Sequence, residues 1–204
     1  MDVEREPVSD RRALRLLWLA AVLGVGVGVT MSGCAPLATL RALGGLGRDR
    51  DAEAGAAMTT VGPRPYVDEP WRGAAQLWGS LRASKALELS AVTAFDTQAF
   101  ALGAAARLSF LQEDPFTLGG ELELGWLWGA LALHASLRIA DEWRLYTAPR
   151  IGNWGDEWAP GIPVGLNAPL FSGLALRVEG QVNWAGFRYC NRRVLLAAGL
   201  AYQW

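Results

Sequence analysis

The chain has 204 residues, of which 51% are hydrophobic and 19% are charged, and its formal net charge is −1. This length suits one domain with short flanking segments, and the near-neutral charge excludes a basic surface for nucleic acid. The only long apolar run, residues 16–29, lies near the N-terminus, so the remainder is not a multi-span helical membrane protein.

The first residues have the features of an export signal. Three arginines between positions 11 and 15 precede the apolar run, as the charged region of a secretory signal peptide does. The sequence Met31-Ser32-Gly33-Cys34 follows and resembles the lipobox of bacterial lipoproteins. That resemblance implies a signal peptide over residues 1–33, a fatty acyl anchor on Cys34 and, because Ala35 follows, delivery to the outer membrane. The alternative is an uncleaved transmembrane anchor over residues 14–31.

The next segments carry weaker patterns. Residues 34–70 contain paired glycines, alternating charges and prolines without a sustained apolar period, which predicts a flexible tether. Residues 71–84 fit two interpretations. Trp71, Ala75, Trp78 and Leu81 share roughly one helical face after Pro70, which suits a first helical turn. A strand over residues 76–82 is the competing interpretation.

From residue 85 onward, apolar residues recur at every second position, which indicates β-strands with one apolar face. The sixth strand is the least regular because Pro163 and Pro169 each lack a ladder donor, and residues 152–161 form the longest predicted loop. An even number of strands closes an antiparallel barrel. The eight expected strands lie near residues 86–95, 98–111, 121–128, 130–140, 143–151, 162–170, 174–184 and 192–204.

The last of these strands resembles the C-terminal strand of bacterial outer-membrane β-barrels. Its apolar residues alternate up to a terminal aromatic, which the assembly machinery reads in that family. The resemblance implies an assembly signal at Leu200, Tyr202 and Trp204. It also implies partners, namely outer-membrane lipid and the barrel-assembly and lipoprotein-sorting machinery of a Gram-negative bacterium. The predicted fold is therefore all-β: an antiparallel, up-and-down, eight-stranded transmembrane β-barrel over residues 85–204.

Alternation alone does not say which face of the strands is outward. A lipid-tethered periplasmic barrel of lipocalin type has an apolar lumen and binds a small apolar ligand. Two features favour the membrane barrel instead: Lys85 is the only lysine, and aromatic residues cluster near strand ends. Those aromatics are Phe95, Trp126, Trp128, Trp143, Trp184, Tyr202 and Trp204.

In a membrane barrel the polar face of each strand points into the lumen, where buried charges must pair or reach water. Arginines and glutamates in comparable number predict a filled lumen without an open pore, and hence a structural, adhesive or accessory role in the envelope. The predicted lumen network consists of Arg107, Glu121, Glu123, His134, Arg138, Arg144, Arg150, Arg177 and Glu179.

One short motif raises an enzymatic alternative. His134-Ala135-Ser136 has the His-x-Ser spacing of lipid A deacylases, which implies acyl transfer by His134 and Ser136, with Glu142 or Glu123 as the acid. Leu137 stands where that family has asparagine, so we interpret both residues as polar groups of the lumen and expect no enzyme. Cys34 and Cys190 match no zinc or redox spacing, so no metal or cofactor is expected.

Overall fold

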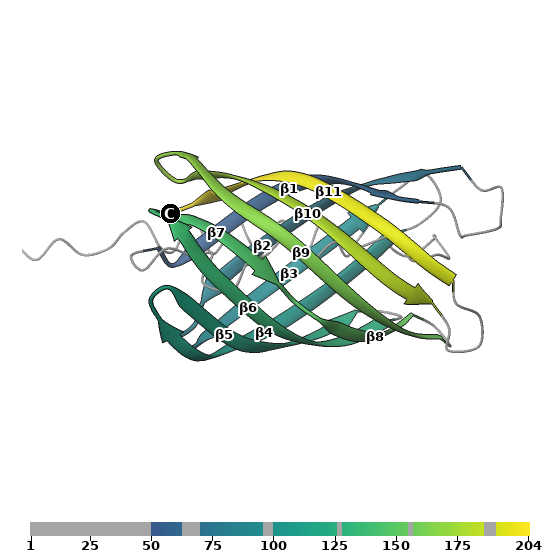
Figure 1. Cartoon of the computed structure of the whole chain (residues 1–204), viewed down its shortest axis with the longest axis horizontal. Coiled ribbons are helices and arrows are strands. Elements are labelled where there is room, and N and C mark those ends of the chain that lie inside the picture. The colour runs from purple at the N-terminus through teal and green to yellow at the C-terminus, as the bar shows by residue number, and fades with distance from the viewer. Residues whose placement is uncertain (1–49, 63–69, 96–99, 126–127, 155–156, 186–190) are drawn as a thin grey trace, which may run out of the picture.

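The computed structural model describes residues 50–62, 70–95, 100–125, 128–154, 157–185 and 191–204. In this part of the chain, tilted strands surround a long lumen (Figure 1). No helix among the described residues has the length and apolar character needed to cross a membrane. The strands are β1 (Ala52–Val61), β2 (Arg72–Arg82), β3 (Leu87–Phe95), β4 (Phe100–Glu113), β5 (Phe116–Gly125), β6 (Trp128–Ala140), β7 (Trp143–Thr147), β8 (Arg150–Trp154), β9 (Glu157–Phe171), β10 (Leu174–Ala185) and β11 (Asn191–Gln203).

The strands form a closed barrel. All strand pairs are antiparallel, successive strands pair except β7 with β8, and β1 pairs with β11 from Glu53↔Gln203 to Val61↔Leu195. Strands β7 and β8 both lie between β6 and β9, so they fill one place in the wall and the barrel has ten strands in all. At the break between them, the Pro149 carbonyl still accepts a 2.9 Å hydrogen bond from the Leu133 amide. The wall is therefore continuous.

The closed antiparallel barrel agrees with the sequence prediction, but the count of eight strands is wrong. Strand β1 lies within residues 34–70, which we expected to be a tether, and β2 occupies the ambiguous residues 71–84. In β1 the outward positions apart from Met58 carry Ala and Thr, and two of the inward positions carry Glu53 and Thr59, so the two faces contrast weakly in hydropathy. The helical pattern in β2 is misleading because Trp78 points inward while Leu77 points outward.

Strand β9 also differs from the prediction. It is the longest described strand, with 15 residues, and residues 152–154 and 157–161 of the predicted long loop belong to β8 and β9. Pro163 and Pro169 lie within the ladder, opposite Gln181 and Ala175 of β10. The irregular composition therefore marks a proline-containing strand instead of a loop.

Two glycines make room for aromatic rings inside the barrel. A side chain at Gly55 of β1 would overlap the indole of Trp78, and one at Gly165 of β9 would overlap the phenol of Tyr146. Both rings are almost fully buried. Trp78 also belongs to a small apolar cluster on one wall of the lumen, formed with residues of β1, β3 and β11: Ala57, Val92, Ala94, Leu195, Ala197 and Ala201.

The ten-stranded barrel predicts strong amide protection in β1 and β2. Hydrogen–deuterium exchange of the folded protein in mild detergent should be as slow over Ala52–Val61 and Arg72–Arg82 as over Asn191–Gln203, because both stretches are hydrogen-bonded on two sides. Fast exchange over Ala52–Val61, with slow exchange in the remaining strands, would contradict the ten-stranded closure and favour eight strands.

Candidate functional site

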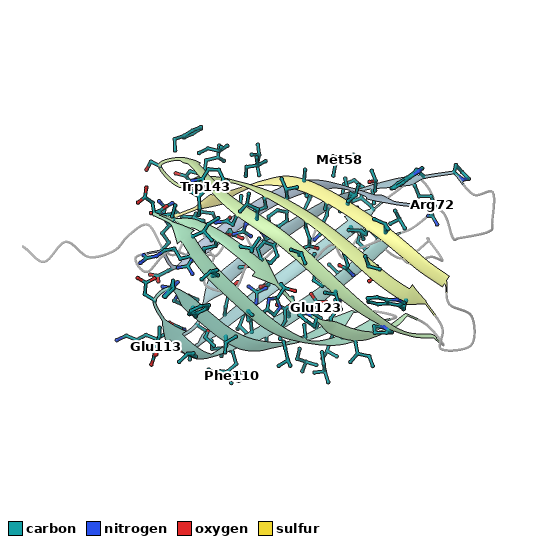
Figure 2. The ribbon with its side chains drawn as sticks, viewed as in Figure 1. Met58, Arg72, Phe110, Glu113, Glu123 and Trp143 are labelled. Atoms are coloured by element: carbon teal, nitrogen blue, oxygen red, sulfur yellow. The ribbon has the colours of Figure 1, made fainter. Side chains whose placement is uncertain are left out.

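The outer surface of the barrel is apolar. Large hydrophobic side chains are exposed on the outward face along most of the wall, among them Met58 of β1, Phe110 of β4 and Leu133 of β6, each more than 60% exposed. Figure 2 shows Met58 and Phe110 projecting away from the barrel on opposite sides. A soluble protein rarely exposes apolar patches larger than a few hundred Å², so this surface is arranged to contact an apolar environment.

Exposed aromatic side chains lie near the two ends of this apolar surface. Trp71 and Phe95 lie at one end. At the other end, Tyr202 and Trp204 stack with their ring centroids 6.0 Å apart, and Phe116, Trp143 and Phe171 are exposed as well. Leu200, Tyr202 and Trp204, the predicted assembly signal, all face outward on or just after β11.

The lumen is polar, and its most connected group is a cluster around Glu53. Arg177 forms a two-pronged ion pair with this carboxylate, through Nη1 at 2.7 Å from Oε1 and through Nη2 to Oε2. Trp78 Nε1 and Gln203 Nε2 donate to the same carboxylate, each at 2.8 Å, and Arg177 Nε donates to Asn167 Oδ1 at 2.9 Å. We call these five residues the Glu53 cluster. It links β1, β2, β9, β10 and β11.

A second group centres on Glu121 of β5. Arg107 of β4 donates from Nε to Glu121 Oε2 at 2.7 Å, and its Nη2 lies 2.6 Å from the same oxygen. His134 Nε2 of β6 lies 3.0 Å from the same oxygen, and Arg107 Nη1 lies 3.4 Å from Glu88 Oε1 of β3. We call these four residues the Glu121 cluster. Glu123 of β5 accepts a 2.6 Å bond from Arg150 of β8, which adds a further strand to this side of the lumen (Figure 2).

Together these groups join all the strands of the wall. The Glu53 cluster covers one half of the circumference and the Glu121 cluster, with the Glu123–Arg150 pair, covers the other. Strand β7 is joined by Tyr146, whose hydroxyl donates to Glu179 Oε2 of β10 at 2.9 Å. Charges buried at this depth are stable only when paired and hydrogen-bonded. Paired, buried side chains thus connect the strands across the described part of the lumen.

Most of the predicted lumen residues lie where the sequence placed them. Arg107, Glu121, Glu123, His134, Arg150, Arg177 and Glu179 are all buried inside the barrel. Arg138 and Arg144 lie instead near one barrel mouth. The Arg138 side chain is 39% exposed and pairs with Asp114. Sequence reasoning did not find Glu53 and Gln203, the first because β1 was read as a tether. The available signal was the alternation in the last strand, which places Gln203 on the same face as Ala197 and Ala201.

The residues of the His-x-Ser motif are buried in the lumen. His134 is 2% exposed and Ser136 is 4% exposed, and both point inward from β6. The carboxylate beside His134 belongs to Glu121, whereas Glu123 pairs with Arg150 and Glu142 lies in an exposed turn. The described residues contain no group of three or more His, Cys, Asp or Glu side chains placed to hold a metal ion. Cys34 and Cys190 lie outside the described residues.

No protein-family model matches the chain, and no curated protein matches it in sequence. Among solved structures, the chain is similar to Neisserial surface protein A, NspA, with 13% identity and a TM-score of 0.36 over 75% of this chain and 96% of that one. It is also similar to the N-terminal β-barrel domain of Pseudomonas aeruginosa OprF, with 10% identity and a TM-score of 0.35 over 75% of this chain and 98% of that one. At these values we draw no functional conclusion from either similarity.

The Glu53 cluster predicts a large stability effect. Replacing Glu53 by Ala leaves the Arg177 guanidinium buried without its ion-pair partner, and we expect the free energy of unfolding to fall by about 3–5 kcal/mol. The matched control, Arg138→Ala, removes a half-exposed pair and should lower it by about 0–1 kcal/mol. Urea titrations followed by tryptophan fluorescence measure both, and equal effects would contradict the cluster's role.

Proposed function

We propose that this chain is a small lipoprotein of the Gram-negative outer membrane, in which a ten-stranded barrel crosses the bilayer with a filled lumen. The observation that carries the proposal is the distribution of polarity: paired charges lie inside the wall, and Leu, Ile, Val, Phe and Met side chains lie outside it. Only closed barrels and helices satisfy their backbone groups within lipid. The aromatic residues near both ends suit the two interfaces of a bilayer.

The alternative, a soluble tethered barrel that binds a small apolar ligand, fits this distribution poorly. Such a barrel needs an apolar lumen and a polar exterior, whereas here Arg107, Glu121 and Arg177 fill the interior. The apolar cluster around Trp78 covers only one wall of the lumen, and Trp78 itself is bonded to Glu53. The interior therefore offers little apolar surface to a ligand.

The filled lumen supports a structural, adhesive or accessory role over channel activity. Ion pairs on opposite sides of the lumen, Arg177 with Glu53 and Arg107 with Glu121, join different strands and occupy the interior with large side chains. An enzymatic role as a lipid A acyl hydrolase receives no support from His134 and Ser136, because both face the lumen while an acyl chain would meet the apolar outer wall. We therefore propose a role without catalysis.

The pairing of β1 with β11 also suits a lipid anchor on Cys34, ahead of the first strand. Because the strand number is even, β1 begins beside the end of β11, where the Trp204 amide donates to the Ala52 carbonyl at 3.1 Å. In the orientation that outer-membrane barrels take, this end faces the periplasm. A lipid on Cys34 would then sit in the leaflet next to the barrel entry, and the sorting and assembly machineries would act from the same side.

The proposal predicts heat-modifiable migration. Protein purified from outer-membrane fractions in mild detergent should run faster on a gel when it is not boiled, because the closed barrel stays folded in the detergent. The Cys34→Ser variant should remain in the membrane fraction, since the barrel alone holds it there. Release of Cys34→Ser into the aqueous phase would instead indicate a soluble barrel held only by its lipid.

The outward face predicts a depth-dependent response to charge. Leu133 lies in the middle of β6 and Phe171 lies at the end of β9, and both are about two-thirds exposed or more. In lipid vesicles, Leu133→Arg should lower the free energy of unfolding by about 2–4 kcal/mol and Phe171→Arg by about 0–1 kcal/mol. Small effects of both variants would argue against a bilayer around the barrel.

A further inference from the structure

The barrel mouth at the C-terminal end contains a cavity of about 350 Å³. Its walls come from the turn between β2 and β3, the turn between β4 and β5, and the facing ends of β6 and β7. Small-molecule sites commonly begin at about 300 Å³, so the space suits a molecule of metabolite size. Glu88, which lines the cavity, has its Oε1 3.4 Å from Nη1 of Arg107 in the Glu121 cluster.

The lining of this cavity carries more positive than negative groups. Arg82, Lys85, Arg138 and Arg144 contribute four cations. The three carboxylates belong to Glu88, Glu113 and Asp114, of which Glu88 is shared with Arg107 below and Asp114 is paired with Arg138. Three of the four cations are guanidinium groups, whose planar donors match the oxygens of carboxylates and phosphates.

Backbone groups and uncharged side chains help to hold the walls of this cavity in place. Gln112 Nε2 of β4 donates to the Lys85 carbonyl at 2.8 Å, and the Ser109 amide donates to the Ala86 carbonyl at 2.8 Å. Ser84 Oγ accepts from the amides of Ala86 and Leu87, at 3.3 Å and 3.1 Å. The turn that carries Lys85 is therefore fixed against β4 before any ligand arrives, which reduces the ordering that binding requires.

We propose that this mouth cavity binds a small, soluble oxyanion, a molecule carrying carboxylate or phosphate groups, with Arg82, Lys85 and Arg144 as its cationic contacts. The contacts lie on the inner side of the mouth, away from the apolar outer wall, so a ligand reaches them from water. This site does not depend on the barrel lying in a bilayer.

The test is calorimetric titration of the full-length folded protein, in an uncharged detergent at low ionic strength, with citrate as the probe. We expect one saturable site per chain. Arg82→Gln and Lys85→Gln should each weaken citrate binding about tenfold. Glu113→Gln removes a negative charge that repels citrate, so it should strengthen binding severalfold. Raising the salt concentration should weaken binding as exposed charges are screened.

The matched control is Arg72→Gln. Arg72 and Arg82 begin and end the same strand, β2, so they lie at opposite ends of the barrel, and Figure 2 shows Arg72 at the end opposite Glu113. Arg72→Gln should leave citrate affinity unchanged. Equal weakening by Arg72→Gln, or no binding at millimolar citrate, would overturn the proposal. Displacement of citrate by a short-chain phosphatidylglycerol, and not by inorganic phosphate, would overturn the assignment to a soluble ligand.

Discussion

The structure depends on one constraint: ionised side chains inside the barrel must be neutralised by partners on other strands. Glu53 and Arg177 show how this is met, because their ion pair joins β1 to β10 across β11, and Trp78, Asn167 and Gln203 satisfy the remaining donors and acceptors. A partly satisfied network would be less stable than an apolar core. Among the described residues, the interior can therefore be polar because charged side chains such as Arg107, Arg150 and Arg177 are paired with carboxylates.

Because the interior is polar and the outer surface is apolar, the inward and outward positions of each strand carry different residues. Outward positions tolerate many apolar residues, from Ala56 to Phe110, since each needs only to contact an apolar medium. Inward positions are specific, since Glu121 must meet both Arg107 and His134 at hydrogen-bonding distance. Substitutions should accordingly be tolerated on one face of each strand and restricted on the other.

The sequence predicts the barrel where the two faces contrast and fails where they do not. Alternation in β4, β10 and β11 is strong, and the inward residues Arg107 and Arg177 follow directly from it. In β1 the outward residues are mostly small, so composition suggested a tether and hid Glu53. The number of strands also depends on the register β1↔β11, a contact between chain ends that local periodicity does not contain. Which lumen residues contact one another depends on that closure. The sequence therefore placed residues on the inward face of a strand but did not predict their partners.

The closing seam has a consequence for how the protein is made. Arg50 donates to the Gln203 carbonyl across 153 positions of sequence, and the Trp204 carbonyl accepts from the Asp51 and Ala52 amides. The ladder therefore remains open until the final residues are available, and an incomplete chain presents two unpaired strand edges, which favour aggregation. Contacts this distant in sequence also form slowly. Closure of the cylinder thus has to wait until β11 has been synthesised, although its partner β1 is made first.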